Sequence, residues 1–148
     1  MPRTRAANPR PSQVQVAGRH APLSRADVVR AARTVLAAER RVAQLSISFV
    51  GRDAMRRINW RWTARDSATD VLAFPLPLPD GSLAGDIYIC PWVAVREAGD
   101  LGLSVRLELI RLVVHGVLHV LGYDHPEGQG RMKSPMWKRQ ERLVRRVR

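Results

Sequence analysis

The 148-residue sequence contains a single cysteine, Cys90, and therefore cannot form an internal disulfide. We expect packing alone to hold the fold and the protein to work in a reducing compartment. The chain has no run of about 18 apolar residues, so no membrane-spanning helix is predicted. Its basic, proline-rich beginning, MPRTRAANPRPSQ, lacks the apolar stretch of a secretory signal. These absences favour a soluble cytoplasmic protein with no membrane contact.

Aromatic and acidic residues are also scarce. Aromatics make up 5% of the chain, so base stacking would contribute little if the partner were a nucleic acid. Thirteen acidic residues stand against 25 lysines and arginines, and the net charge is +12. Residues 1–65 hold 14 arginines, residues 66–130 are acidic, and residues 131–148 hold eight basic side chains. Two basic arms favour a polyanion such as nucleic acid, although solvated helix faces explain the charge about equally well.

The hydrophobic pattern predicts one domain with mixed secondary structure. Strands are expected at 13–17, 45–50, 70–74 and 83–90, and helices at 25–40, 52–62, 91–98, 105–121 and 135–148. Ser24, Ser104 and Ser134 are candidate helix starts. The prolines of PLPLP (75–79) should end the third strand, since each removes a backbone donor. We predict an α+β fold with a single mixed β-sheet of about four strands packed with helices. Residues 1–12 are expected to be a disordered basic tail, and residues 13–148 a single domain.

Three of the four histidines lie within the segment HGVLHVLGYDH, residues 115–125. His115 and His119 are four residues apart on an apolar helix, so they project from one face. Gly122 can end that helix and turn His125 back toward them. Three converging imidazoles are typical of a catalytic zinc site, which keeps its fourth position open for water. Packing explains the histidines less well, because each buried imidazole without a partner costs about 1–3 kcal/mol.

The same spacing matches the metzincin protease pattern in every ligand and in its glycine. Gly116, however, stands where those proteases carry the glutamate that acts as general base. The site can therefore hold a metal but lacks the base of a peptidase at the usual place. Asp124 precedes the third ligand and is a candidate acceptor for a ligand ring N–H. An ordinary role in the turn is the alternative for Asp124.

The histidine segment resembles the signature of the YbeY family of endoribonucleases, the bacterial rRNA maturation factors. Residues 58–74, INWRWTARDSATDVLAF, are similar to the family's L-N-x-x-Y-R-x-x-x-x-x-T-D-V-L-S-F. Residues 85–87 resemble its G-D-I strand, residues 108–112 the lead-in to its histidine helix, and residues 136–141 its C-terminal helix. The resemblance extends over roughly residues 14–147.

This resemblance implies a zinc-dependent, single-strand-selective endoribonuclease, with the histidine helix packed against the sheet. Its role would be maturation of the 3′ end of 16S rRNA, ribosome biogenesis and ribosome quality control. One Zn²⁺ per chain would be held by His115, His119 and His125, which would also form the centre of catalysis. The implied partners are rRNA and the 30S subunit, with ribosomal proteins or a GTPase as further partners.

One position departs from the family pattern. The family usually has an arginine directly after the aromatic residue of L-N-x-x-Y-R, where it is thought to contact RNA phosphate. Here Thr63 follows Trp62, and a threonine hydroxyl offers one weak donor where a guanidinium binds phosphate with two. Arg61 and Arg65 flank this position and are candidates for the same contact, with a merely solvated role as an equal alternative.

Two other functions stay open at this level. A different metallohydrolase, such as a peptidase or amidase, is supported by the metzincin-like spacing and opposed by Gly116. A non-catalytic ribosome-assembly factor would use zinc structurally. Structural zinc sites normally have four protein ligands, and Cys90 is the side chain that could complete such a set.

Overall fold

The computed structural model describes residues 10–147, apart from the side chain of Gln129. The elements in chain order are β1 (Gln13–Gly18), α1 (Arg25–Glu39), β2 (Ala43–Phe49), α2 (Arg52–Thr63), β3 (Val71–Pro77), β4 (Leu83–Ile89), α3 (Pro91–Asp100), α4 (Val105–Val120), the 3-10 helix η1 (Gly128–Lys133) and α5 (Pro135–Val147). This order confirms the predicted succession of strands and helices. The described residues add the short helix η1 to this succession.

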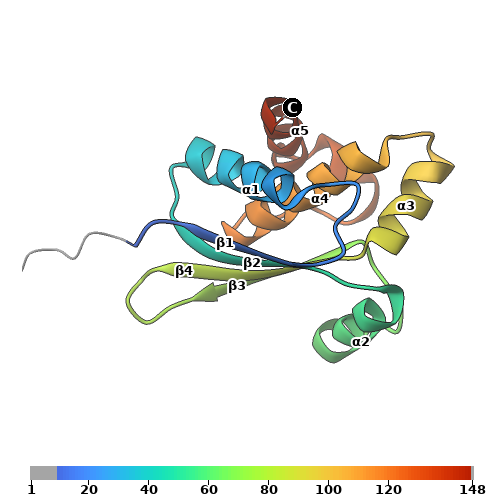
Figure 1. Cartoon of the computed structure of the whole chain (residues 1–148), viewed down its shortest axis with the longest axis horizontal. Coiled ribbons are helices and arrows are strands. Elements are labelled where there is room, and N and C mark those ends of the chain that lie inside the picture. Colours follow the sequence, from blue (N-terminus) through green and yellow to red (C-terminus); the bar gives the residue numbers. More distant parts are fainter. Residues whose placement is uncertain (1–9, 148) are drawn as a thin grey trace, which may run out of the picture.

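A four-stranded mixed sheet forms the centre of the fold, in the order β1-β2-β4-β3. The pairs β1–β2 and β2–β4 are parallel, and the hairpin β3–β4 is antiparallel. Helices α1, α4 and α5 lie on one face of the sheet, and α2 lies on the other side at one end of the strands (Figure 1). The predicted α+β class with a single mixed sheet is confirmed.

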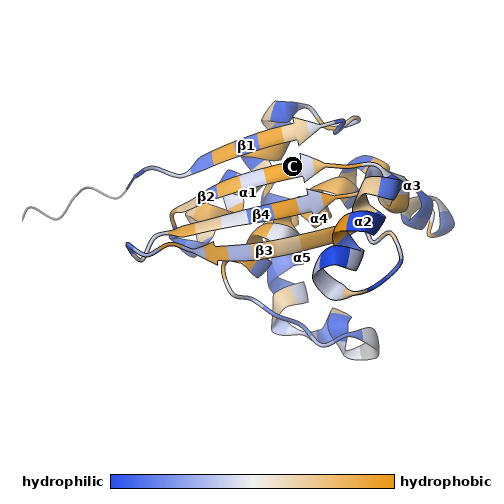
Figure 2. Ribbon diagram, turned by 90° about the horizontal axis from the view of Figure 1, so that it is seen from below, coloured by the Kyte–Doolittle hydropathy of each residue, from blue (hydrophilic) through white to orange (hydrophobic). Residues whose placement is uncertain are grey.

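The two faces of the sheet differ in polarity because helices cover only one of them. In β2 every second residue, including Leu45 and Ile47, is buried against the helical layer. The intervening residues, among them Gln44 and Ser46, point to the other face, which is turned toward the viewer in Figure 2. Burying one such aliphatic side chain contributes about 1.5–3 kcal/mol, so this alternation fixes the register of the strand.

Helix α4 is the most buried helix and lies unusually close to β4. A Cβ atom on Gly116 would come within 2.7 Å of a methyl carbon of Ile87, and one on Gly85 within 2.5 Å of Val120. Both glycines are therefore required for the close approach of helix and sheet. This contact sets the position of the histidines that α4 carries.

The predicted start of α1 is confirmed by its capping interactions. The Ser24 hydroxyl accepts from the backbone N–H of Asp27 at 3.0 Å, and the Asp27 carboxylate accepts from the backbone N–H of Ser24 at 2.8 Å. Ser104 likewise caps α4 through the backbone N–H of Leu107 at 3.3 Å. These caps satisfy backbone donors that have no partner within the helix.

The predicted end of the third strand is wrong. Strand β3 continues through Pro75 and Pro77, which pair with Gly85 and Leu83. It tolerates both prolines because it is an edge strand, where a missing donor on the outer side breaks no ladder. This extension lengthens the hairpin, so that all seven residues of β3 pair with β4.

Most of the predicted disordered tail, residues 1–9, lies outside the described residues. At its end, the carbonyl of Pro11 accepts from the side chain of Gln44, and the hydroxyl of Ser12 accepts from the backbone N–H of Ala43. None of the helices in the described part of the chain has the length and apolarity that crossing a bilayer requires.

Candidate metal centre

The three predicted ligands come together at the end of α4. His115 and His119 project from the helix, and His125 returns from the loop after it, in which Gly122 adopts a positive φ of 102°. The ring centroids are 4.6 Å apart for the helical pair and 5.1 Å apart for each pair that includes His125. One ring nitrogen of each lies within 4.8 Å of the other two, so the three form a group able to hold a metal ion.

Two of the imidazoles are oriented by hydrogen bonds on the ring nitrogen that faces away from this centre. His115 Nδ1 lies 2.7 Å from Oε1 of Gln140, a side chain of α5 that is 2% exposed. His125 Nδ1 lies 3.0 Å from the carbonyl of Pro126. A carbonyl oxygen only accepts, so each Nδ1 carries the proton and each Nε2 keeps its lone pair for a metal.

The protonation of the site also fits a metal. Burial lowers the pKa of His115 to about 3, although the hydrogen bond that it donates to Gln140 acts in the opposite direction. Burial also lowers the pKa of His119, with a further decrease from His125. Neutral imidazole is the form that coordinates metal ions, so both rings are ready to bind at neutral pH.

A side chain at position 116 would point away from this centre. The position that a Cβ would take at residue 116 faces Ile87 on β4, inside the contact between helix and sheet. A glutamate there would enter the core and could not reach a water molecule at the histidines. The metzincin arrangement is therefore incompatible with this packing, and not merely absent from the sequence.

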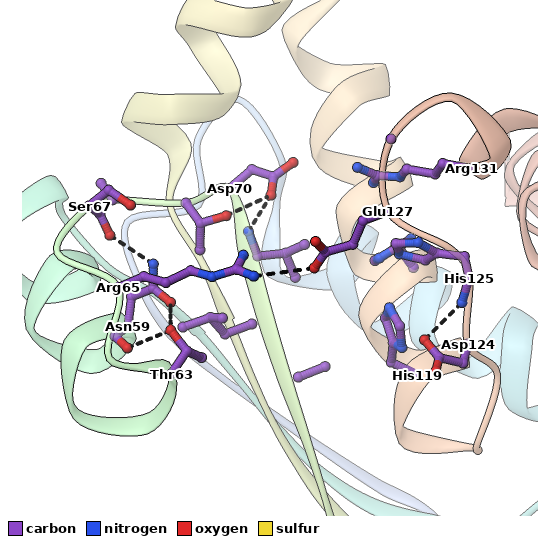
Figure 3. Close-up of a pocket in the computed structure, with 17 residues that line it drawn as sticks. Asn59, Thr63, Arg65, Ser67, Asp70, His119, Asp124, His125, Glu127 and Arg131 are labelled. Carbon is purple, nitrogen blue, oxygen red and sulfur yellow. Dashed lines mark hydrogen bonds and ion pairs between the residues drawn. The ribbon is translucent and has the colours of Figure 1, made fainter.

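A cleft of about 510 Å³ opens beside the histidines. Its walls come from the end of α2, the loop 65–70, β3, α4 and the segment 124–131. Asn59, Thr63 and Arg65 lie on one side, and His119 and His125 lie on the other (Figure 3). The cleft therefore joins the metal centre to the segment that was predicted to bind RNA.

The predicted RNA-binding residues have different positions. Arg65 lines the cleft and reaches across it to Glu127, at 3.4 Å (Figure 3). Thr63 also lines the cleft and donates its hydroxyl to the backbone and side-chain oxygens of Asn59. The guanidinium of Arg61 instead lies over the ring of Trp62, 5.5 Å from its centroid, and is not part of the cleft wall.

Asp124 also lines the cleft, and its carboxylate accepts from the backbone N–H of His125 at 2.8 Å. This contact corresponds to the ordinary role in the turn that was the alternative interpretation of Asp124. Acceptors for ring N–H groups are supplied by Gln140 and the carbonyl of Pro126. The sequence analysis did not identify Gln140. It could have been found as an amide among the apolar residues that α5 buries, because a polar side chain there needs a hydrogen-bond partner.

A second group of ionisable side chains adjoins the cleft. Carboxylate oxygens of Asp70, Glu97 and Glu108 lie within 4.8 Å of one another. Burial raises the pKa of both glutamates, and the charge of Asp70 raises both pKa values further. The positive charge of Arg131, a cleft residue that no sequence pattern indicated, acts in the opposite direction.

Comparisons with known proteins identify the family to which the chain is similar. A family model described as Endoribonuclease YbeY matches residues 12–148. Proteins named Endoribonuclease YbeY are similar to this chain in Bifidobacterium longum, with 41% identity over 61% of this chain and 55% of the relative, and in Salinispora tropica, with 44% identity over 58% and 64%. A third, from Parafrankia sp., is 40% identical over 70% of this chain and 71% of its own length. The chain spans between about half and two thirds of the length of the first relatives it matches.

The fold has a solved counterpart as well. The solution structure of TM1509 from Thermotoga maritima superposes with a TM-score of 0.65 at 26% identity, covering 91% of this chain and 89% of that one. The family model covers almost all of the described chain, and the converging histidines are in place. The chain belongs to the YbeY endoribonuclease family.

Proposed function

We propose that the protein is a zinc-dependent, single-strand-selective endoribonuclease that matures the 3′ end of small-subunit rRNA. The observation that carries this proposal is the group of three converging imidazoles, two of them oriented by hydrogen bonds, at one side of a cleft lined by an arginine. The names of the relatives, Endoribonuclease YbeY, supply the reaction class.

His115, His119 and His125 would hold the ion, and zinc suits three nitrogen ligands. When bound, zinc supplies Lewis-acid chemistry at a phosphoryl oxygen and lowers the pKa of a water molecule. The chain contributes the tautomers of the ligands, through Gln140 and the carbonyl of Pro126. Arg65 contributes a cation that can bind the RNA backbone inside the cleft.

The shape and charge of the molecule support RNA as the substrate. A cleft of about 510 Å³ has the volume of a small-ligand pocket, which suits an unpaired nucleotide better than a duplex. Helix α2 exposes Arg52, Arg57 and Arg61, and α5 exposes Arg142 and Arg145. Such surfaces bind a phosphate backbone through counterion release. A ribosomal substrate would place the protein in the cytoplasm, with the 30S subunit, its proteins or an associated GTPase as partners.

The two other functions are less well supported. A peptidase needs a general base near the metal, and the close packing of Gly116 on Ile87 leaves no room for the usual glutamate. A structural zinc site needs four ligands, whereas the histidine group holds three donor side chains among the described residues. Cys90 is fully buried and is not a member of that group.

The test combines metal analysis with cleavage assays on the full chain. Purified protein should contain about one zinc per chain, cleave single-stranded RNA, and lose cleavage on treatment with chelator. His115→Ala should abolish cleavage, while casein should stay intact. RNA affinity should fall steeply as salt rises. Undiminished RNA cleavage by the metal-free protein or by His115→Ala would refute the proposal, and so would cleavage of casein alone.

A further inference from the structure

Arg131 lies in the cleft with the histidines, although it belongs to a different element. It is part of η1 and lines the same cavity as His119 and Arg65. Its side chain lies on the histidine side of the cleft and extends toward Asp70 (Figure 3). A cation thus stands beside the metal centre at a position that none of the predicted RNA-binding residues occupies.

The guanidinium of Arg131 has unused capacity for hydrogen bonds. Its Nε is buried and has no hydrogen-bond partner among the described residues. Within residues 10–147, none of the ion pairs includes Arg131. Buried donors in folded proteins are nearly always paired, so an unpaired Nε in a side chain that lines the cleft indicates a ligand or solvent partner.

The backbone of Arg131 is held firmly in place. Ser134, which is 5% exposed, donates its hydroxyl to the Arg131 carbonyl at 2.6 Å and its N–H to the same oxygen at 3.1 Å. The same hydroxyl accepts from the backbone N–H of Trp137 in the first turn of α5. Arg131 is therefore tied to the helix whose Gln140 orients His115, which fixes its position relative to the metal centre.

The other arginines near the cleft are already engaged or directed elsewhere. Arg61 lies over Trp62, and Arg56 makes two hydrogen bonds to the carboxylate of Asp66. Arg65 pairs with Glu127 at 3.4 Å, but both side chains are more than half exposed. An exposed pair of this kind contributes little stability, so a phosphate can displace Glu127 from Arg65.

We propose that Arg131 and Arg65 form a phosphate-binding site that holds the backbone of single-stranded RNA from the two sides of the cleft. Arg131 contacts the phosphodiester group next to the metal centre, and Arg65 contacts the chain across from it. This inference rests on the proposed RNA substrate. A guanidinium donates two parallel hydrogen bonds to a phosphate, and its charge stabilises negative charge that develops on the phosphoryl oxygens. Arg131 is thereby a catalytic residue of this chain.

The experiment compares Arg131→Gln with Arg96→Gln in the full-length protein. Arg96 stacks on Trp92 on α3, away from the cleft, and its replacement removes the same charge. Two kinds of assay are used: steady-state kinetics of the zinc-loaded protein on single-stranded RNA give kcat and KM, and a salt series gives the RNA affinity of chelator-treated protein. Arg131→Gln should lower kcat/KM about 10²–10³-fold, mainly through kcat. It should also reduce the salt slope of binding by about 1. Arg96→Gln should leave both at wild-type values.

A rescue variant separates phosphate binding from a structural role. Thr63 lines the opposite wall of the same cleft, so Thr63→Arg in the Arg131→Gln background should restore part of the RNA affinity and of the salt slope but not kcat, which depends on the contact beside the metal centre. Arg131→Lys should keep the salt slope but recover only part of kcat, because an ammonium binds as a point charge.

Two results would overturn the inference. One is an Arg131→Gln variant that behaves like Arg96→Gln. The other is a loss of rate that accompanies lower zinc content and a lower melting temperature, with a salt slope equal to that of the wild type. If the zinc-loaded wild type cleaves no RNA, the proposed function itself fails. The salt slope of RNA binding then still decides whether Arg131 contacts phosphate.

Discussion

Two groups of three ionisable side chains in this protein each place their ligand atoms within 4.8 Å of one another, and they are built differently. In the group of His115, His119 and His125, burial lowers the pKa of both helical members. In the group of Asp70, Glu97 and Glu108, burial raises the pKa of both glutamates. Burial favours the neutral form in both cases, but only for histidine is the neutral form a good metal ligand.

The hydrogen-bond partners around the two groups also favour metal binding by the histidines and not by the carboxylates. Two histidines have a hydrogen-bond acceptor on the ring nitrogen that faces away from the metal centre. The Glu108 carboxylate lies 3.7 Å from Arg111, whose shorter contact, at 2.9 Å, is with Glu141. Proximity alone therefore does not make a metal site. A metal site also needs rings that are oriented and in the protonation state that coordinates a metal. The neighbouring carboxylates, by contrast, gain protons as the pH falls.

The largest expected effect comes from removing a ligand of the histidine group. His119→Ala should lose zinc and RNA cleavage, with zinc affinity falling by more than the roughly 10–100-fold typical of changes to residues behind the ligands. Glu97→Gln, which removes one ionisable side chain from the carboxylate group, should leave the zinc content of the protein unchanged. Metal analysis after dialysis measures both variants. Equal zinc loss in the two would erase the distinction between the groups.

The orientation of His115 can be tested through Gln140. Gln140→Ala removes the acceptor at 2.7 Å from Nδ1 and should weaken zinc binding about 10–100-fold without removing a ligand. Gln15→Ala is a suitable control, because it removes the same amide from an exposed position on β1. Competition with a fluorescent chelator gives the affinities. Wild-type zinc affinity in Gln140→Ala would show that the ring orientation does not depend on this contact.

The metal-free protein should lose stability as the pH falls below neutrality. The pKa of His115 is about 3 in the folded state against 6.5 for the free side chain, so the unfolded state binds more protons between these values. Stability therefore decreases as pH falls through about 6.5, by about 2 kcal/mol between pH 7 and pH 5. Urea unfolding of chelator-treated protein at both pH values measures this change. His115→Gln should show a smaller decrease, and an equal decrease would assign the effect to other groups.

The smallest effect is expected at the carboxylate group, with the opposite sign. The folded-state pKa of Glu108 is raised, so its ionised form costs stability at neutral pH and the cost disappears as pH falls through that pKa. Glu108→Gln should therefore raise the urea midpoint slightly at pH 7 and have less effect near pH 4. Glu97→Gln should act in the same direction, since its pKa is raised by the same causes. A midpoint that fell at pH 7 would mean that the contact with Arg111 outweighs the burial.

Local patterns were the most predictable part of the molecule. The capping box at Ser24, the start of α4 at Ser104 and the convergence of His115, His119 and His125 all depend on residues near one another in sequence. Helical spacing and one positive-φ glycine are sufficient to place such residues. For this reason the metal-binding group was predictable without knowledge of the tertiary fold.

Features that depend on distant segments were not predictable in the same way. Strand β3 passes through two prolines because it lies at the edge of the sheet. Arg61 is two residues before Thr63, the position that was predicted to bind RNA, but lies over Trp62, whereas Arg131, 70 residues further along than Arg61, lines the cleft. Sequence distance from Thr63 was therefore a poor guide to which arginine stands near the histidines.

The sequence by itself determined the three-histidine group, the succession of elements and the strong positive charge, because spacing, capping and composition are local properties. The tertiary structure alone decided which side chains surround that group. It brought Gln140 from α5 behind His115, turned Gly116 into the sheet and placed Arg131 in the cleft. These choices follow from packing α4 between β4 and α5, and packing depends on the shape of surfaces that meet only after the chain has folded.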